Sequence, residues 1–117
     1  MRENSGSIDH IPTVTTSTFE RLVLQGDGPI AVEFMSYSCA YCGALEPILQ
    51  QAAEFLKDKE TILRVNIVIE QDLAESFGIQ GTPTFVMFLN GSEVGRAEGP
   101  HPTLSSLLAE LTQPFGL

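Results

Sequence analysis

The chain has two cysteines, separated by only two residues in the sequence Cys39-Ala40-Tyr41-Cys42. Just upstream, residues 30–35 form a mostly apolar run that is typical of a buried strand. Downstream, residues 44–57 carry apolar side chains at helical spacing. The pair is therefore expected where a buried strand gives way to a helix. This placement restricts both the fold and the chemistry open to the chain.

Two neighbouring thiols can form a small disulfide, supply half of a metal site or simply fill space. A cysteine at a helix N-terminus lies beside unpaired backbone N–H groups and the positive end of the helix dipole, which favour the nucleophilic thiolate. Zinc usually takes four ligands, and the two histidines are His10, in the expected N-terminal tail, and His101, in a late turn. The placement favours redox chemistry, and no metal ligands are predicted. A pair of buried structural cysteines is the alternative.

The 117 residues carry a formal net charge of −9, from 6 basic and 15 acidic residues. This acidic balance argues against binding to nucleic acid or to an anionic membrane, since both need basic surface. No apolar run approaches the length of a membrane span, and the polar start lacks the apolar core of a signal peptide. The chain as given is expected in the cytoplasm, and an exported form whose leader has been removed is the alternative.

The order of the elements predicts an α/β fold. Residues 1–12 are expected to form a flexible tail and residues 13–117 one domain, with a short edge strand at 13–15. Ser17 and Glu20 match a capping box at the start of a short helix. Further strands are predicted at 30–35, 61–69, 85–89 and 92–98, and further helices at 44–57, 71–77 and 103–111. Their alternation, and the hairpin signal Asn90-Gly91, predict a central mixed sheet with a parallel core, an antiparallel C-terminal hairpin and helices on both faces.

A buried strand ending in Cys-x-x-Cys, a helix containing Pro47 and a later Gly-x-Pro-Thr before a hairpin strand together resemble the thioredoxin family. The resemblance runs from about residue 13 to residue 111. It implies a thioredoxin fold and thiol–disulfide oxidoreductase activity that needs no metal or organic cofactor. It makes Cys39 the exposed nucleophile, Cys42 the buried resolving cysteine and Pro83 a cis proline that packs against the disulfide.

Glu33 falls six residues before Cys39, where typical thioredoxins have a buried aspartate. Arg64 falls where many of them have a lysine near that acid. Burial on a strand should raise the pKa of Glu33, so that its carboxylate takes the proton from Cys42 when Cys42 attacks. A partly exposed or Arg64-paired acid with no catalytic role is the alternative.

A substrate peptide is expected to pair with the backbone exposed at the cis proline, as an added strand. The predicted substrate-binding residues are Tyr37, Tyr41, Gly81, Thr82 and Pro83. Tyr41 is the adjustable one, because it can shield Cys39, contact the substrate or donate its hydroxyl. An exposed aromatic side chain with no role is the alternative for Tyr41.

The dipeptide Ala40-Tyr41 replaces the Gly-Pro of typical thioredoxins, and the chain has no tryptophan. This loop is similar to those of bacterial disulfide oxidases and isomerases, although the long helical insertion expected of the oxidases is absent. The expected activity is reduction of protein disulfides by a monomer that thioredoxin reductase or another dithiol donor regenerates. The alternatives are an exported oxidase or isomerase and a redox-sensing docking module without turnover, since the fold does not fix the direction.

Overall fold

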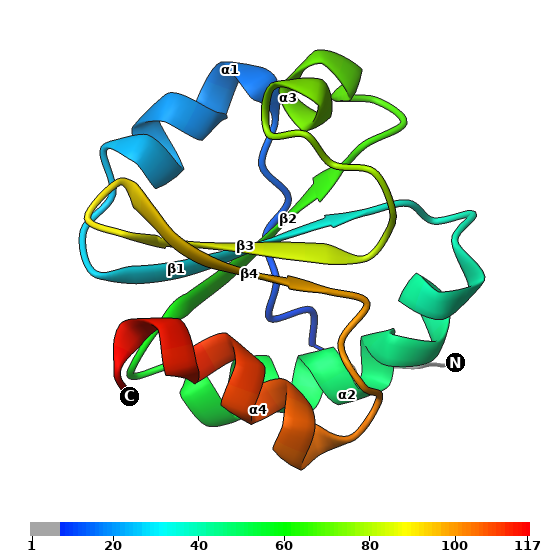
Figure 1. Cartoon of the computed structure of the whole chain (residues 1–117), viewed down its shortest axis with the longest axis vertical. Coiled ribbons are helices and arrows are strands. Elements are labelled where there is room, and N and C mark those ends of the chain that lie inside the picture. The colour runs from blue at the N-terminus through cyan, green and yellow to red at the C-terminus, as the bar shows by residue number, and fades with distance from the viewer. Residues whose placement is uncertain (1–7) are drawn as a thin grey trace.

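A four-stranded mixed sheet forms the centre of the computed structural model, which describes residues 8–117 (Figure 1). The strand order is β2-β1-β3-β4. β1 (Pro29–Met35) runs parallel to β2 (Thr61–Asn66) and antiparallel to β3 (Thr84–Leu89), and β3 runs antiparallel to β4 (Ser92–Glu98). The predicted mixed sheet is confirmed, with β1 and β2 as its parallel part and the C-terminal hairpin as its antiparallel part.

Helices cover both faces of this sheet, as predicted (Figure 1). On one face lie α3 (Gln71–Ser76) and α1 (Thr16–Phe19), which runs on into the π-helical turn η1 (Glu20–Leu24). On the other face lie α2 (Ala40–Leu56) and α4 (Leu104–Thr112), followed by the 3₁₀ turn η2 (Gln113–Phe115). None of the helices within residues 8–117 combines the length and the apolar character that a membrane crossing requires.

The alternation of side chains along the strands divides the core into two layers. On β3, Phe85 and Met87 pack with leucines of α2 and α4, whereas Val86 and Phe88 pack with residues of α1, η1 and α3. On β1, Ala31 belongs to the α2–α4 layer and Val32 to the opposite layer. Position 33 therefore points toward α2, and this alternation is what places a buried carboxyl beneath the active-site helix.

The long helix α2 continues through Pro47 and buries one stripe of side chains. The buried positions are Cys42, Leu45, Leu49, Ala52, Ala53 and Leu56. Phe55, one of the apolar residues of the segment 44–57, is 62% exposed. At 100° per residue, position 55 lies about 110° from the centre of these buried positions, whereas position 53 lies about 50° from it, so the smaller Ala53 faces the sheet.

The N-terminal segment packs against the domain earlier than the sequence indicates. Ile11, expected in the flexible tail, is 1% exposed and belongs to the α2–α4 layer. The Pro12 carbonyl accepts a hydrogen bond from the Arg64 backbone N–H at 3.0 Å, and Arg64 in turn forms a single parallel bridge with Thr13. The edge strand expected at 13–15 is reduced to this bridge. Residues 1–7 of the expected tail lie outside the described residues.

The N-cap of the first helix is Thr15 rather than Ser17, which lies inside α1. Thr15 is the N-cap, and its backbone N–H donates to Oγ1 of Thr18 at 3.0 Å. Glu20, expected to complete the capping box, lies beyond the last residue of α1. A threonine hydroxyl therefore fills the role that the sequence pattern gave to the glutamate two residues later.

Candidate active site

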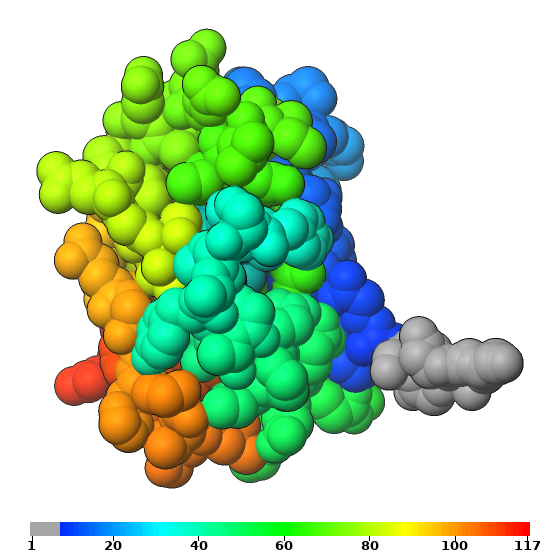
Figure 2. Space-filling view, turned by 90° about the vertical axis from the view of Figure 1, so that its right-hand side faces the viewer, coloured from blue at the N-terminus to red at the C-terminus, as the bar shows by residue number. Residues whose placement is uncertain are grey.

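The two cysteines lie where β1 ends and α2 begins, as the sequence predicts. Cys39 is the N-cap of α2, and its backbone N–H donates to the Ser36 carbonyl at 3.2 Å. The Ser36 and Ser38 hydroxyls lie 2.8 Å apart and close the short turn between strand and helix. Figure 2 views this side of the molecule, where the cyan and teal chain around residues 36–42 lies beside the yellow-green chain near residue 80 and the orange chain near residue 100.

The Cys39 thiol is partly exposed and accepts a hydrogen bond from the Cys42 backbone N–H at 3.1 Å. Burial acts to raise the pKa of Cys39. Hydrogen bonds with Cys42, with Thr82 and with the backbone N–H groups of Tyr41 and Cys42 lower this pKa by more than burial raises it. The pKa of Cys39 therefore lies below its ordinary value. The thiolate, which is the nucleophile in disulfide exchange, is favoured at this position.

Cys42 lies one turn further along α2 and is 3% exposed. Burial raises the pKa of Cys42 to about 11, and the hydrogen bond with Cys39 acts in the same direction. At neutral pH the Cys42 side chain is therefore a thiol, and it must lose a proton before it can attack. The two cysteines thus differ in the way that a nucleophilic and a resolving thiol require.

The Thr82–Pro83 peptide bond is cis and lies against the cysteine pair. The Thr82 carbonyl oxygen is 3.6 Å from the Cys39 sulfur, within hydrogen-bonding distance of the thiol. Pro83 is buried, and its carbonyl accepts from the Gly99 backbone N–H at 2.9 Å. The segment from Gly81 to Pro83 is therefore fixed beside the reactive sulfur, with Gly81 exposed and Thr82 half-buried.

The two predicted tyrosines take different positions around the pair. Tyr41 donates its hydroxyl to the Pro100 carbonyl and so ties the first turn of α2 to the segment before α4. Of the three uses foreseen for Tyr41, hydroxyl donation is the one the structure contains. Tyr37 is 72% exposed and lies in the turn between β1 and α2.

Three charged side chains lie together beneath the cysteines: Glu33 of β1, Arg64 of β2 and Glu46 of α2. Glu33 is fully buried, and among residues 8–117 neither of its carboxylate oxygens has a hydrogen-bond partner. Arg64 is 4% exposed, with its Nε 3.7 Å from Oε1 of Glu33 and its Nη2 2.8 and 2.7 Å from the two Glu46 oxygens. Burial raises the pKa of Glu33 to about 7; the positive charge of Arg64 opposes this and the negative charge of Glu46 adds to it.

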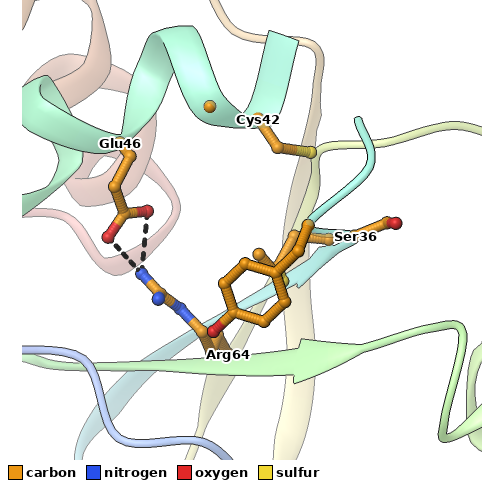
Figure 3. A pocket seen from close by; sticks show the side chains of 7 residues that line it. Ser36, Cys42, Glu46 and Arg64 are labelled. Carbon is orange, nitrogen blue, oxygen red and sulfur yellow. Dashed lines mark hydrogen bonds and ion pairs between the residues drawn. The ribbon is translucent and has the colours of Figure 1, made fainter. Parts of the chain in front are cut away.

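A pocket of about 140 Å³ lies between Cys42 and the Arg64–Glu46 pair, and its lining does not include Glu33 (Figure 3). It is lined by Cys42 and Gly43 of α2, by Glu46 and Arg64, and by Met35, Ser36 and Tyr37. Figure 3 shows Arg64 reaching up to Glu46, with Cys42 on the helix beside them. A pocket of this size has room for a few water molecules, which can carry a proton between Cys42 and the charged groups.

The sequence places Glu33 and Arg64 in this site but misses Glu46. The available signal was its spacing, because Glu46 follows Cys42 by four residues and therefore lies on the same face of α2. Within residues 8–117, no group of three or more histidine, cysteine or acidic side chains is arranged to hold a metal ion. His10 lies against Glu54, with Nε2 at 3.2 Å from Oε1.

Comparison with known proteins agrees with this geometry. The thioredoxin family model matches residues 10–113. The chain is 33% identical to a thioredoxin of Pseudomonas aeruginosa over 84 residues, which cover 72% of this chain and 78% of the relative. It is 32% identical to a thioredoxin of Alicyclobacillus acidocaldarius over 103 residues, which cover 86% of this chain and 97% of that relative.

A protein named as a probable protein disulfide-isomerase A6 of Medicago sativa is 29% identical over 109 residues. The match covers 92% of this chain but 30% of that larger relative. The family model and the two thioredoxins each cover more than two thirds of the chain, and the Cys-x-x-Cys pair occupies the start of α2. The chain belongs to the thioredoxin family and is a thioredoxin-like thiol–disulfide oxidoreductase.

Proposed function

We propose that this protein reduces disulfide bonds in other proteins. The Cys39 thiolate attacks one sulfur of the substrate disulfide, forming a mixed disulfide and releasing the other substrate sulfur as a thiolate. Cys42 loses its proton and attacks Cys39, which forms the Cys39–Cys42 bond and frees the second substrate sulfur. The substrate disulfide gains two electrons, and the dithiol of the protein is oxidised to a disulfide.

The observation that carries this direction is the environment of the Cys39 thiolate. The groups that lower the pKa of Cys39 are Cys42, Thr82 and the backbone N–H groups of Tyr41 and Cys42. No basic side chain among residues 8–117 contributes to this lowering. Strong disulfide oxidants owe their potential to a stabilised reduced form. Hydrogen bonds without a neighbouring cation support a reducing couple rather than an oxidising one.

Glu33 acts as the acceptor of the Cys42 proton in this proposal. The raised pKa, near 7, keeps a useful fraction of Glu33 ionised at neutral pH while making that carboxylate a stronger base than an exposed one. Glu33 lies on the α2 side of β1, and its neighbour Arg64 lines the pocket beside Cys42, which supports proton transfer from Cys42 to Glu33 along this side of the sheet. The close approach of Arg64 leaves the charged form of Glu33 accessible.

The substrate peptide binds across the cis-proline segment. Its backbone pairs with that of Thr82 as an added strand, which places the substrate disulfide at the partly exposed Cys39 sulfur. Gly81 and Pro83 leave this segment without bulky side chains, and the exposed Tyr37 and the fixed Tyr41 ring provide contacts on either side.

The oxidised form must receive two electrons before the next turnover. A thioredoxin reductase or another dithiol donor supplies them, and no metal or organic cofactor takes part in the cycle. This direction of electron flow fits a reducing compartment such as the cytoplasm, with the protein acting as a monomer.

The proposal is tested by the reduction of insulin disulfides in the presence of dithiothreitol, followed as the turbidity of the released B chain. The parent protein should shorten the lag before precipitation, Cys39→Ser should match the uncatalysed reaction, and Cys42→Ser should accumulate a mixed disulfide with insulin. Full activity of Cys39→Ser would overturn the catalytic assignment. If the parent protein does not reduce insulin but does oxidise reduced ribonuclease, the proposed direction of electron flow would be wrong, while the roles of the two cysteines would stand.

A further inference from the structure

Arg64 lies between two carboxylates and makes hydrogen bonds to only one of them. Glu33 and Arg64 are paired positions on the neighbouring parallel strands β1 and β2, so their side chains leave the sheet side by side. Glu46 approaches the same guanidinium from α2, which covers this face of the sheet. Both Glu46 oxygens lie within 2.8 Å of Nη2, whereas Glu33 stands 3.7 Å from Nε without a hydrogen bond.

We propose that Glu46 is a positioning residue, which directs the Arg64 guanidinium toward itself and thereby leaves the Glu33 carboxyl without a hydrogen-bonding partner. The proposal rests on the proposed role of Glu33 as the proton acceptor. Glu33 and Glu46 compete for the Arg64 guanidinium away from water, because Arg64 is 4% exposed and Glu33 is fully buried. A buried cation that satisfies one carboxylate leaves the second with an uncompensated charge, which favours its protonated form.

Glu46 is itself held in this orientation from the outside. Gln50, one turn further along α2, donates from Nε2 to Glu46 at 2.8 Å and to Asp9 at 2.8 Å. The side-chain oxygen Oε1 of Gln50 accepts a hydrogen bond from the His10 backbone N–H at 2.8 Å. The packed N-terminal segment thus fixes Gln50, Gln50 fixes Glu46, and Glu46 holds Arg64. A surface contact is in this way connected to the interior of the active site.

Few other groups can act on Glu33. The charged side chains that face it are Arg64 from β2 and Glu46 from α2. Cys42 lies on the same helix and lines the adjoining pocket. On the other side, the paired β3 residue is the buried Phe85, and α4 contributes Leu107 and Leu111 to the same layer. The arrangement of Arg64 is therefore the variable that decides how readily Glu33 holds its proton.

Substituting Glu46 by glutamine removes the competing charge at nearly constant shape. Arg64 is then expected to turn its free Nε–H toward Glu33, because Glu33 is the remaining buried carboxylate within reach. A hydrogen bond to the charged form of a carboxyl lowers its pKa further. The midpoint of Glu33 should therefore fall in Glu46→Gln, both through this hydrogen bond and through the loss of the Glu46 charge.

The test follows two signals by nuclear magnetic resonance in the full chain: the carboxyl carbon of Glu33 during a pH titration, and the Nε–H of Arg64. In Glu46→Gln the Glu33 midpoint should move down, and the Arg64 proton should shift downfield and exchange more slowly with water. Gln50→Leu should move the Glu33 midpoint and the Arg64 signal in the same directions, by smaller amounts. Glu75→Gln, which removes an exposed charge from α3 on the opposite face of the sheet, should leave both signals unchanged.

An unchanged Glu33 midpoint in Glu46→Gln would overturn the proposal. A lowered midpoint with an unchanged Arg64 signal would overturn it too, because the effect would then be direct charge repulsion rather than positioning. Neither readout depends on turnover. Failure of Glu33→Gln to slow the release of substrate would remove the proton-acceptor role, while the two signals would still report whether Glu46 positions Arg64.

Discussion

Glu60 should make the protein less stable as the pH rises. This residue lies between α2 and β2 and is 6% exposed, and neither carboxylate oxygen has a hydrogen-bond partner within the described part of the chain. Burial raises the pKa of Glu60 from its ordinary value of 4.5 to about 8. Below pH 4.5 both folded and unfolded chains hold the proton, so the contribution to stability is complete. Between pH 4.5 and 8 the unfolded chain ionises while the folded one does not, and stability is lost.

The magnitude follows from the size of this shift. Each pH unit between 4.5 and 8 lowers the free energy of unfolding by about 1.4 kcal/mol. The loss over the whole window therefore has an upper limit of about 5 kcal/mol. Local relaxation and entry of water reduce this, and an observed loss of about 2 to 4 kcal/mol between pH 5 and pH 8 is expected. Glutamine at position 60 keeps the shape and does not titrate. The substitution should therefore remove this part of the pH dependence.

The assay is urea unfolding of the parent, Glu60→Gln and Glu75→Gln at pH 5, 6, 7 and 8. Glu75 is an exposed carboxyl on α3 and serves as the matched control. The stability of Glu60→Gln relative to the parent should increase steadily from pH 5 to pH 8, while Glu75→Gln should follow the parent. A residual slope in Glu60→Gln is expected from Glu33, whose pKa is raised in the same direction. Parallel curves for the parent and Glu60→Gln would refute the reasoning.

Three further substitutions test other parts of the structure. Glu33→Gln should slow the release of substrate from the mixed disulfide at pH 7 by about 10²-fold in stopped-flow measurements, while attack by Cys39 keeps its rate; equal release rates would contradict the proton-acceptor role. Gly91→Ala should cost about 2 kcal/mol or more in urea unfolding, because Gly91 has a φ of 85° and an added Cβ would lie 2.1 Å from the Leu24 carbonyl oxygen. Ile11→Ala should cost about 2 to 5 kcal/mol by the same assay, since Ile11 is 1% exposed in the α2–α4 layer; a cost below about 0.5 kcal/mol would show that this segment does not belong to the core.

The sequence predicts the fold well wherever a local pattern determines the structure. The hairpin turn is an example, because Asn90 and Gly91 both adopt positive φ, at 50° and 85°, as their residue types favour. The strand-to-helix placement of Cys39 follows in the same way from the apolar run before it and the helical spacing after it. In both cases the residues that carry the signal are neighbours in the chain.

The features that the sequence misses depend on contacts between distant segments. Ile11 is surrounded by polar and proline residues in the sequence, so its burial is decided by apolar side chains of α2 and β2 that come together only after folding. Glu46 resembles any partly exposed helix glutamate until β2 places Arg64 beneath it. The acidity of Glu33 likewise depends on how Arg64 divides its hydrogen bonds. The chemistry of the cysteine pair can thus be predicted from the motif, whereas the tuning of its proton acceptor cannot.

The equilibrium reduction potential of the Cys39–Cys42 couple, measured against glutathione at pH 7, tests the proposed direction most directly. The reduction potential is about −270 mV for thioredoxin, about −180 mV for protein disulfide isomerase and about −120 mV for a strong bacterial disulfide oxidase. Hydrogen bonds without a cation at Cys39 predict a value below about −230 mV, within the reducing range. A value above about −180 mV would contradict the proposal that this protein reduces its substrates.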